Sequence, residues 1–338
     1  LSVERTSLGD IPLTVFRSAG DVRDAPVVVI AHGFAGSQQL MHPLAVTLAR
    51  NGHVAVTFDF PGHGRNDIPM PGRGDDWDAR QRVLADALDA VGDHARRVLS
   101  ADGRYAVLGH SMASDLIVRH AQSQPAVHAT IALSAFAPTV RAGDPPDRPA
   151  NLLVIVGALE PEALRREALR VTRPAEPERA EPGMTYGAFG DGTARRAAIA
   201  RGVEHIGVLY AAATLHEALD WVNRAFDADR GTQGAPFLDT RGPWLALLLG
   251  GLVALAWPLS KLLPRVGHRA APTFSRRAFW TAALVPAVLT PLLLWPVPTG
   301  VLPVLLADYL VLHFALYGAL TLVLTARARP QPMPDRDP

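Results

Sequence analysis

The chain has 338 residues, with 33 lysines and arginines against 32 acidic residues and a charged fraction of only 19%. The net charge of +1 argues against nucleic-acid binding, and the absence of cysteine excludes disulfides, thiolate nucleophiles and cysteine-ligated metals. Soluble domains usually carry about 25% charged residues, so part of this chain is expected to lie in lipid. Lys261 is the only lysine, and this bias toward arginine favours a GC-rich bacterial source.

The N-terminal part, residues 1–227, has dispersed charges and short apolar runs that alternate with longer amphipathic stretches. This alternation predicts a soluble α/β domain with crossover helices. The first buried strand is expected at 27–33, followed by an amphipathic helix that Ser37 caps and Gly52 ends. The run 53–64 repeats the plan of a strand followed by a glycine-rich turn.

A charged helix is expected across 77–100, and a strand at 105–108 then runs into Gly109-His110-Ser111-Met112-Ala113 and a further helix. A strand, a sharp turn and a helix are the context of a nucleophile elbow, whose strained turn lifts a serine hydroxyl clear of the sheet. Small residues are needed two positions before and after the serine, because the turn presses them against neighbouring backbone. Ala113 stands where glycine is usual, and the turn is expected to tolerate its methyl group. Ser111 is therefore the candidate nucleophile.

Three motifs in this order and spacing resemble an α/β-hydrolase of the serine esterase and lipase type over residues 26–227. The resemblance implies an α/β-hydrolase sheet with flanking helices and does not extend to the apolar C-terminal region. The motifs are Ala31-His32-Gly33-Phe34, Asp59-Phe60-Pro61-Gly62-His63-Gly64 and Gly109-His110-Ser111-Met112.

In this family the nucleophile is followed along the chain by an acid and then by a histidine. The acid comes just beyond the strand expected at 151–157, which makes Glu160 the candidate and Asp144 the reserve. The alternative is that Glu160 only starts the helix after it, where a negative charge is favoured. The loop before the last helix of the domain resembles the family's histidine loop, so His205 is the candidate base. His216, inside that helix, is expected to pack.

The resemblance implies a Ser-His-Glu triad that cleaves carboxylic esters through an acyl-enzyme. His205 accepts the proton of Ser111, and Glu160 holds the imidazole in the useful tautomer. The backbone N–H groups of Phe34 and Met112 form the implied oxyanion hole. Family frequency favours a carboxylic ester, small or lipid-like, with thioester and peptide substrates as alternatives.

The other histidines of the motifs, His32, His110 and His63, are expected to be structural. None has metal-ligand spacing, so neither a metal nor a cofactor is expected. About 15 residues join the sixth strand, at 128–136, to the seventh. This connection is too short for a helical cap, which predicts a shallow pocket with loops 66–78 and 171–192 as candidate lips.

The C-terminal region holds three uncharged stretches of 19, 30 and 18 residues, ending at 260, 307 and 326. A spanning helix needs about 20 apolar residues, so three transmembrane helices are predicted, with buried core helices as the alternative. The predicted spans are 243–263, 279–297 and 300–325, within a membrane region 243–326 that follows a linker 228–242 and precedes a polar tail 327–338.

The charges of the loops predict the topology. The segment that joins the first two spans carries five basic residues and no acidic residue, whereas the turn between the second and third spans carries no charge. The five are Lys261, Arg265, Arg269, Arg276 and Arg277. The positive-inside rule then makes the first loop cytoplasmic and places the hydrolase domain on the periplasmic or extracytoplasmic side of a bacterial inner membrane. This arrangement needs a leader or a preceding span. A start without methionine fits a removed leader or a longer protein.

Two further classes of function compete with the enzyme. The fold could be a catalytically idle binding module of a membrane assembly, but the retention of Ser111, Glu160 and His205 together argues against it. Asp308 and His313 are ionisable groups in the last span, where an interhelical hydrogen bond is favoured over a proton path. The expected partners are an acyl substrate and membrane lipid, with no nucleic acid.

Overall fold

A computed structural model describes most of the chain, in two units, Leu1–Ala246 and Leu247–Pro338. Parts of the expected lip loops, of the linker, of the loop between the first two spans, of the beginning of the predicted third span and of the polar tail lie outside the described residues. The described residues are 1–18, 25–70, 77–141, 143–172, 180–227, 235–263, 274–298, 305 and 307–328.

The first unit is built on a sheet that has nine strands in the described residues, in the order β1-β2-β4-β3-β5-β6-β7-β9-β8. The six strands from β4 to β9 are parallel, and antiparallel strands flank them at both edges. Parallel strands are covered on both faces, which is why β3 is apolar and buried throughout. The strands are β1 Ser2–Leu8, β2 Ile11–Arg17, β3 Val27–Ala31, β4 Val54–Phe58, β5 Tyr105–His110, β6 Val127–Leu133, β7 Leu152–Gly157, β8 Thr185–Tyr186 and β9 Arg195–Ala200.

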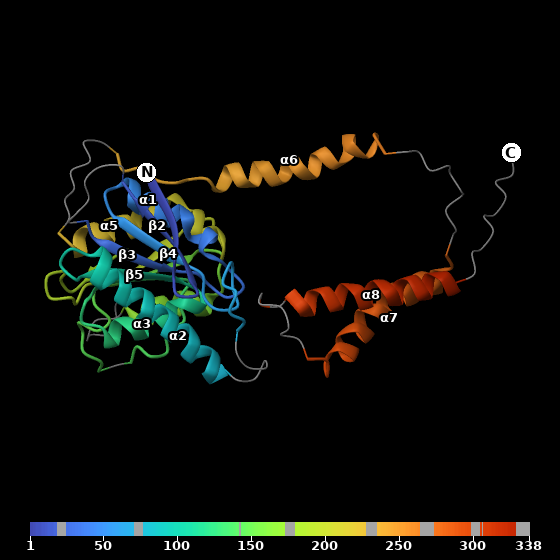
Figure 1. The fold of residues 1–338 in the computed structure, drawn as a ribbon, viewed down its shortest axis with the longest axis horizontal. Coiled ribbons are helices and arrows are strands. Elements are labelled where there is room, and N and C mark those ends of the chain that lie inside the picture. Colours follow the sequence, from blue (N-terminus) through green and yellow to red (C-terminus); the bar gives the residue numbers. More distant parts are fainter. Residues whose placement is uncertain are drawn as a thin grey trace. The chain divides into compact units, whose positions relative to one another are not determined.

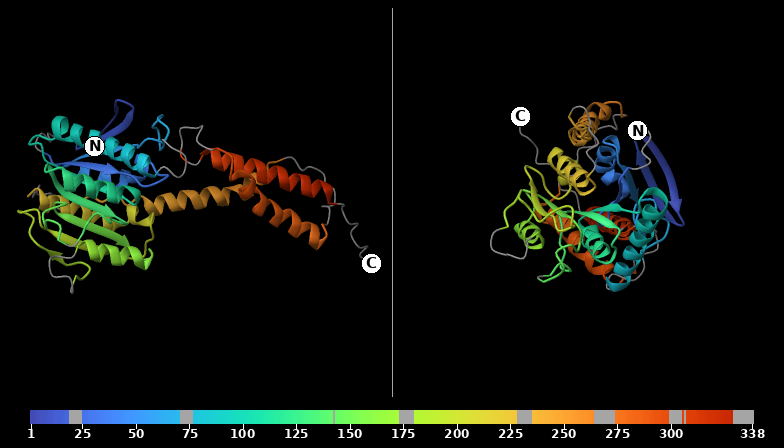
Figure 2. Two further views of the ribbon diagram at one scale, coloured as in Figure 1. Left: turned by 90° about the horizontal axis from the view of Figure 1, so that it is seen from below. Right: turned by 90° about the vertical axis from the view of Figure 1, so that its left-hand side faces the viewer.

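Helices cover both faces of this sheet (Figures 1 and 2). The apolar sides of α1 (His42–Arg50) and α5 (Ala212–Ala225) close one core. Those of α2 (Trp77–His94), α3 (Met112–Ser123) and α4 (Glu162–Val171) close the other. Strand order, crossovers and layers are those of the α/β-hydrolase fold, as the sequence predicted. No helix lies between β6 and β7 in the described residues.

Two local expectations were wrong. The helix after β3 begins with the 3₁₀ turn η1 (Gln38–Met41), and the Ser37 side chain makes no capping hydrogen bond. The Asp59 carboxylate accepts from the Gln38 N–H instead, over 2.8 Å, so a residue from the turn after β4 takes the place of the local cap. His216 is exposed on α5 and does not pack into the core.

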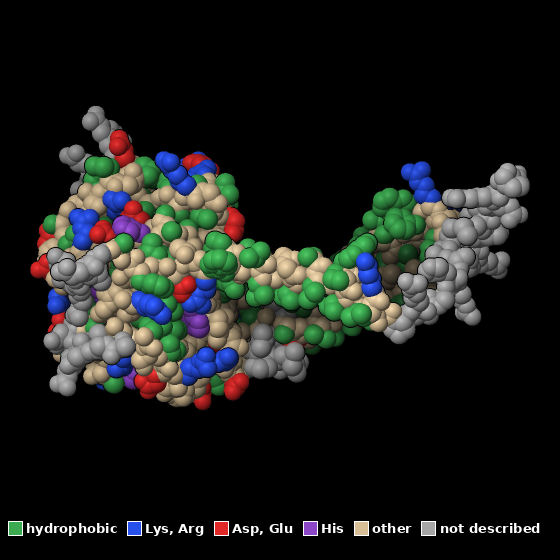
Figure 3. All heavy atoms as spheres, turned by 90° about the horizontal axis from the view of Figure 1, so that it is seen from above, with side chains coloured by type: hydrophobic (Ala, Val, Ile, Leu, Met, Phe, Trp, Pro, Cys, Tyr) green, Lys and Arg blue, Asp and Glu red, His purple; other side chains and the backbone are tan. Residues whose placement is uncertain are grey.

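The second unit contains two helices and most of a third, all long and apolar enough to cross a membrane. They are α6 (Gly242–Ser260), α7 (Arg276–Leu294) and α8 (Ala307–Arg327). Their surfaces are mainly hydrophobic (Figure 3). Pro286 and Pro291 lie inside α7 without ending it, as membrane helices tolerate.

Candidate active site

The sharp turn between β5 and α3 holds Ser111 in a strained backbone conformation, with φ 54° and ψ −114°. A non-glycine residue in such a conformation carries a cost that the surrounding structure must sustain. Gly109 explains why a small residue precedes it, because a Cβ there would lie 2.8 Å from the carbonyl oxygen of Ala113. Ala113 itself is fully buried without disturbing the turn. The Ser111 hydroxyl stands at the carboxyl end of β5, half-buried.

Three side chains from loops far apart in sequence form one hydrogen-bonded chain. His205 Nε2 lies 2.9 Å from Ser111 Oγ, and His205 Nδ1 lies 2.6 Å from Glu160 Oε1. His205 follows β9 and Glu160 follows β7, so the chain runs along the carboxyl edge of the parallel sheet. The structure therefore brings together the three residues selected from the sequence. Asp144 lies elsewhere, where its carboxylate accepts from the Arg141 N–H.

The Glu160 carboxylate is buried and fully engaged. Its Oε2 accepts from the Ser134 hydroxyl over 2.9 Å and from the Gly157 N–H over 2.6 Å. Burial raises the pKa of Glu160, but the hydrogen bonds from His205, Gly157 and Ser134 outweigh burial and hold its pKa below the ordinary value. The charged form is therefore the stable one. Glu160 does more than start α4, whose N-cap is Pro161.

Ser134 is a site residue that the sequence analysis missed. It follows β6 and has a φ of 54°, a second strained position beside the site. Its N–H donates to the Ile155 carbonyl, which fixes its hydroxyl against Glu160. No signal in the sequence marked it, because the sixth strand was expected at 128–136 and would have included Ser134, whereas β6 ends at Leu133.

The His205 loop is held by its neighbours. The Glu204 carboxylate accepts from the N–H groups of Ile206 and Gly207 at 2.8 and 2.7 Å, and His110 Nε2 lies 2.9 Å from the His205 carbonyl oxygen. Burial lowers the pKa of His110 to about 4, so the ring is neutral and donates this hydrogen bond. The hydrogen bond to Glu160 raises the pKa of His205 above 6.5, which strengthens it as a base.

The two N–H groups expected to stabilise an oxyanion, those of Phe34 and Met112, donate no hydrogen bond within the described residues. The β3 loop lies directly against the elbow, because a Cβ at Gly33 would be 3.1 Å from Ser111 Cβ. Both donors thus belong to backbone that adjoins the nucleophile.

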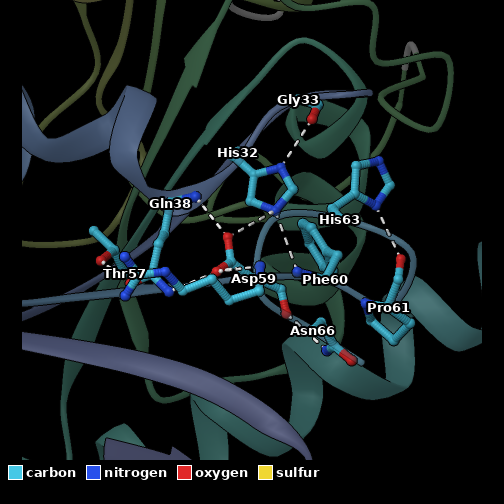
Figure 4. A network of polar contacts seen from close by, with 10 residues as sticks. His32, Gly33, Gln38, Thr57, Asp59, Phe60, Pro61, His63 and Asn66 are labelled. Carbon is cyan, nitrogen blue, oxygen red and sulfur yellow. Dashed lines mark hydrogen bonds and ion pairs between the residues drawn. The ribbon is translucent and has the colours of Figure 1, made fainter. Parts of the chain in front are cut away.

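A buried polar network lies under the β3 loop (Figure 4). The Asp59 carboxylate accepts from Gln38 Nε2 over 2.7 Å and from the Arg65 N–H over 3.2 Å, in addition to the Gln38 N–H. His32 Nδ1 lies 2.8 Å from the Gly33 carbonyl oxygen. His63 Nδ1 lies 2.9 Å from the Pro61 carbonyl oxygen. The network ties the β3 loop to the turn after β4.

Four exposed apolar side chains follow the carboxyl ends of parallel strands, as the residues of the hydrogen-bonded chain do, and we call them the apolar collar. Each one follows a parallel strand and lies within two residues of a residue described above. They are Phe34 after β3, Phe136 after β6, Leu159 after β7 and Ile206 after β9, with exposed fractions of 53%, 63%, 67% and 44%. Such a concentration at one edge indicates a surface for an apolar group. No cluster of three or more metal-binding side chains occurs among the described residues.

Residues 23–175 match the family model described as serine aminopeptidase, S33. No curated protein sequence matches the chain. The structure is similar to Est1E from Butyrivibrio proteoclasticus, with 13% identity, 67% of this chain and 99% of that chain covered, and a TM-score of 0.47. A ferulic-acid-bound form of Est1E is 14% identical, with 66% of this chain and 99% of that chain covered and a TM-score of 0.49. TT1662 from Thermus thermophilus is 17% identical, with 67% of this chain and 98% of that chain covered and a TM-score of 0.47. The family match supports a hydrolase.

Proposed function

We propose that the protein is a membrane-anchored serine hydrolase that cleaves carboxylic esters of apolar acyl groups. The hydrogen-bonded chain from Ser111 through His205 to Glu160, which begins at a strained elbow, carries the proposal. A serine hydroxyl is a weak nucleophile at neutral pH and needs an adjacent base. His205 is within hydrogen-bond distance of the hydroxyl, and its raised pKa suits it to take the proton.

In the proposed reaction, Ser111 Oγ attacks the acyl carbon while its proton passes to His205 Nε2. The carbonyl oxygen becomes an oxyanion, which the N–H groups of Phe34 and Met112 stabilise. The C–O bond to the alcohol then breaks, and the alcohol leaves with the proton from His205. Water attacks the resulting acyl-enzyme by the same route and releases the acid. Glu160 remains ionised throughout and stabilises the imidazolium.

The apolar collar favours an apolar acyl group over a peptide N-terminus. The matched family's description makes an aminopeptidase the second candidate, and such an enzyme must hold an ammonium group near the nucleophile. The two carboxylates nearest the collar in sequence are both engaged, that of Glu160 with His205 and that of Glu204 with backbone N–H groups. Neither is free to bind an ammonium group.

A fluorophosphonate probe tests the proposal on the full-length protein. We expect stoichiometric labelling of Ser111, hydrolysis of p-nitrophenyl esters, and no hydrolysis of aminoacyl p-nitroanilides. Ser111→Ala and His205→Ala should each lower kcat by about 10⁴- to 10⁶-fold, since triad members act as a unit. Asp144→Ala is the matched control for an acid after β6 and should keep full activity. A wild-type protein that neither labels nor hydrolyses any ester would favour the idle binding module.

A further inference from the structure

A hollow of about 350 Å³ lies in the first unit, between the β1–β2 hairpin, the start of η1 and the turn after β4. Arg5 of β1 and Arg65 of that turn line it, and no acidic residue is among the described residues that do so. Three further lining residues carry hydroxyl groups, namely Thr6, Ser7 and Thr14. The size of the hollow and its positive charge suit a small anionic group.

The two guanidinium groups are free to bind a ligand. The side chains of Arg5 and Arg65 are exposed and make no ion pair within the part of the chain that the structure describes. The contact of Arg65 with Asp59 uses its backbone N–H. Gln38 also lines the hollow, but its amide is engaged by Asp59 and Thr57 (Figure 4). Guanidinium groups match the geometry of phosphate oxygens and hold them by charge-assisted hydrogen bonds.

The linker into the first predicted span is docked on α1. Asn51, just after α1, exchanges two hydrogen bonds with the backbone of Phe237, at 2.7 and 3.1 Å. One turn earlier in α1, Thr47 Oγ1 accepts from the Asp239 N–H over 3.0 Å. Two extended residues span about 7 Å and one helical turn about 5 Å, so the linker follows α1 toward its first residue, His42.

The linker therefore reaches the membrane beside the hollow. Burial, Arg241 and Arg5 all lower the pKa of His42, so this ring lies near both guanidinium groups. Arg241 is the last charged residue before the 19 uncharged residues of the first predicted span, and residues at the end of a span lie among the lipid headgroups. Its own guanidinium group is paired with Asp239. Arg241 thus marks the headgroup level and leaves the hollow to Arg5 and Arg65.

We propose that the hollow binds the phosphate of an anionic lipid headgroup, held by Arg5 and Arg65. This ligand is distinct from the ester substrate, and the inference rests on the membrane anchoring in the proposed function. Free phosphate has the same chemistry, but lipid phosphates are concentrated at the level where Arg241 meets the membrane. Because the spans already hold the hydrolase unit at the membrane, even a weak site is occupied there. The lipid gives this unit a second attachment beside the first span.

Titration of the full-length protein in a neutral detergent tests the site. The ligands are dihexanoyl phosphatidylglycerol, dihexanoyl phosphatidylcholine and inorganic phosphate, and the readout is Tm, which rises when a ligand binds the native state. We expect phosphatidylglycerol to raise Tm saturably at concentrations about 10-fold below those that the other two ligands need, since arginines at a membrane favour net negative lipids. Equal effects of the two lipids would refute the site. A stronger effect of inorganic phosphate would refute the lipid as its ligand.

Substitution of the two arginines tests where the lipid binds. Arg5→Gln and Arg65→Gln should each weaken phosphatidylglycerol binding about fivefold or more, which is the contribution of one basic residue near anionic lipid. Both side chains are exposed, so Tm without lipid should equal that of the wild type. Arg201→Gln is the matched control, because Arg201 is also exposed, follows β9 and makes no ion pair among the described residues. Equal weakening in Arg201→Gln would mean that only the overall charge matters, which contradicts a site in the hollow.

The titration needs no catalysis, which separates failure of the inference from failure of the proposed function. Ser111→Ala should bind phosphatidylglycerol as the wild type does. A chain that cleaves esters but does not prefer phosphatidylglycerol would overturn the lipid site alone. A chain whose lipid binding depends on Arg5 and Arg65, but which neither reacts with a fluorophosphonate nor cleaves any ester, would overturn the hydrolase alone.

Discussion

Glu160 is the residue whose surroundings set how basic His205 is. Its Oε1 faces His205 Nδ1, while Ser134 and Gly157 hold its Oε2. These partners keep the carboxylate charged in a buried position, and the charge in turn raises the pKa of His205. The acid thus affects both the orientation of the imidazole and the pH at which it can act as a base.

We predict that Glu160→Gln lowers kcat by roughly 10²- to 10⁴-fold with little change in KM, because the interaction matters most once His205 is charged. The pH profile of kcat/KM should change as well. Activity needs neutral His205, so in the wild type it falls as pH drops below a pKa that lies above 6.5. Without the carboxylate that pKa falls, and the acid limb moves to lower pH.

Steady-state rates between pH 5 and 9 would measure both effects. Glu162→Gln is the matched control, since Glu162 is an exposed acid two residues further along, paired with Arg165. It should leave both kcat and the acid limb unchanged. An acid limb that does not move in Glu160→Gln would mean that Glu160 is not the acid of the proposed triad.

At the level of elements, the strands from β3 to β7 and the elbow were predictable, but β1, β2, β8 and β9 were not located, and neither were the contacts between distant segments. The runs that form β3, β5 and β7 are continuous and apolar because the strands are covered on both faces. Gly109 marked the elbow because a Cβ at this position would lie only 2.8 Å from the Ala113 carbonyl oxygen.

The missed features depend on partners brought close only by folding. Asp59, in the turn after β4, takes the place of the expected Ser37 cap. The role of Ser134 depends on a carboxylate that lies beyond the next strand. Local pattern predicts elements and the order of site residues, whereas such cross-strand hydrogen bonds follow from the sheet topology.

The apolar collar consists of four side chains that each follow a parallel strand. Its apolar character predicts a preference among substrates. A longer acyl chain covers more of the collar, and each buried CH₂ contributes about 0.8 kcal/mol. We expect kcat/KM for p-nitrophenyl esters to rise from acetate to octanoate. The double variant Phe136→Ser with Leu159→Ser should lower kcat/KM for the octanoate ester by about 10-fold or more. It should leave kcat/KM for the acetate ester unchanged.

Val98→Ser is the matched control for the collar, because Val98 is equally exposed, at 66%. It precedes β5 and so lies near the amino-terminal ends of the parallel strands, away from the collar. It should not affect the preference. If the collar variant and wild type respond equally to chain length, the acyl group binds elsewhere.

At the level of the whole chain, the three long apolar helices are candidate membrane spans, and we propose the membrane surface as the setting for the chemistry. All three have the length and composition of membrane spans. α7 packs against α8, and the buried residues of α7 are Pro286, Thr290 and Leu294. A substrate with an apolar acyl group partitions into lipid. An anchored hydrolase would therefore work where such a substrate is concentrated.

The last prediction concerns the side of the membrane on which the hydrolase domain lies. The stretch from Lys261 to Arg277, which joins α6 to the first turn of α7, carries five basic residues and no acid. Arg327 and Arg329 follow the third apolar stretch. The positive-inside rule places both segments in the cytoplasm. Three crossings then put residues 1–227 on the opposite, periplasmic or extracytoplasmic side.

Alkaline phosphatase is active only outside the cytoplasm, so in the complete gene product a fusion after residue 230 should be active and one near residue 270 silent. Replacement of the five basic residues by glutamine should weaken this contrast, since each contributes to retention of the loop. The reverse pattern of activity would place the hydrolase domain in the cytoplasm, as would be expected if the stretch with Pro286 and Pro291 does not cross.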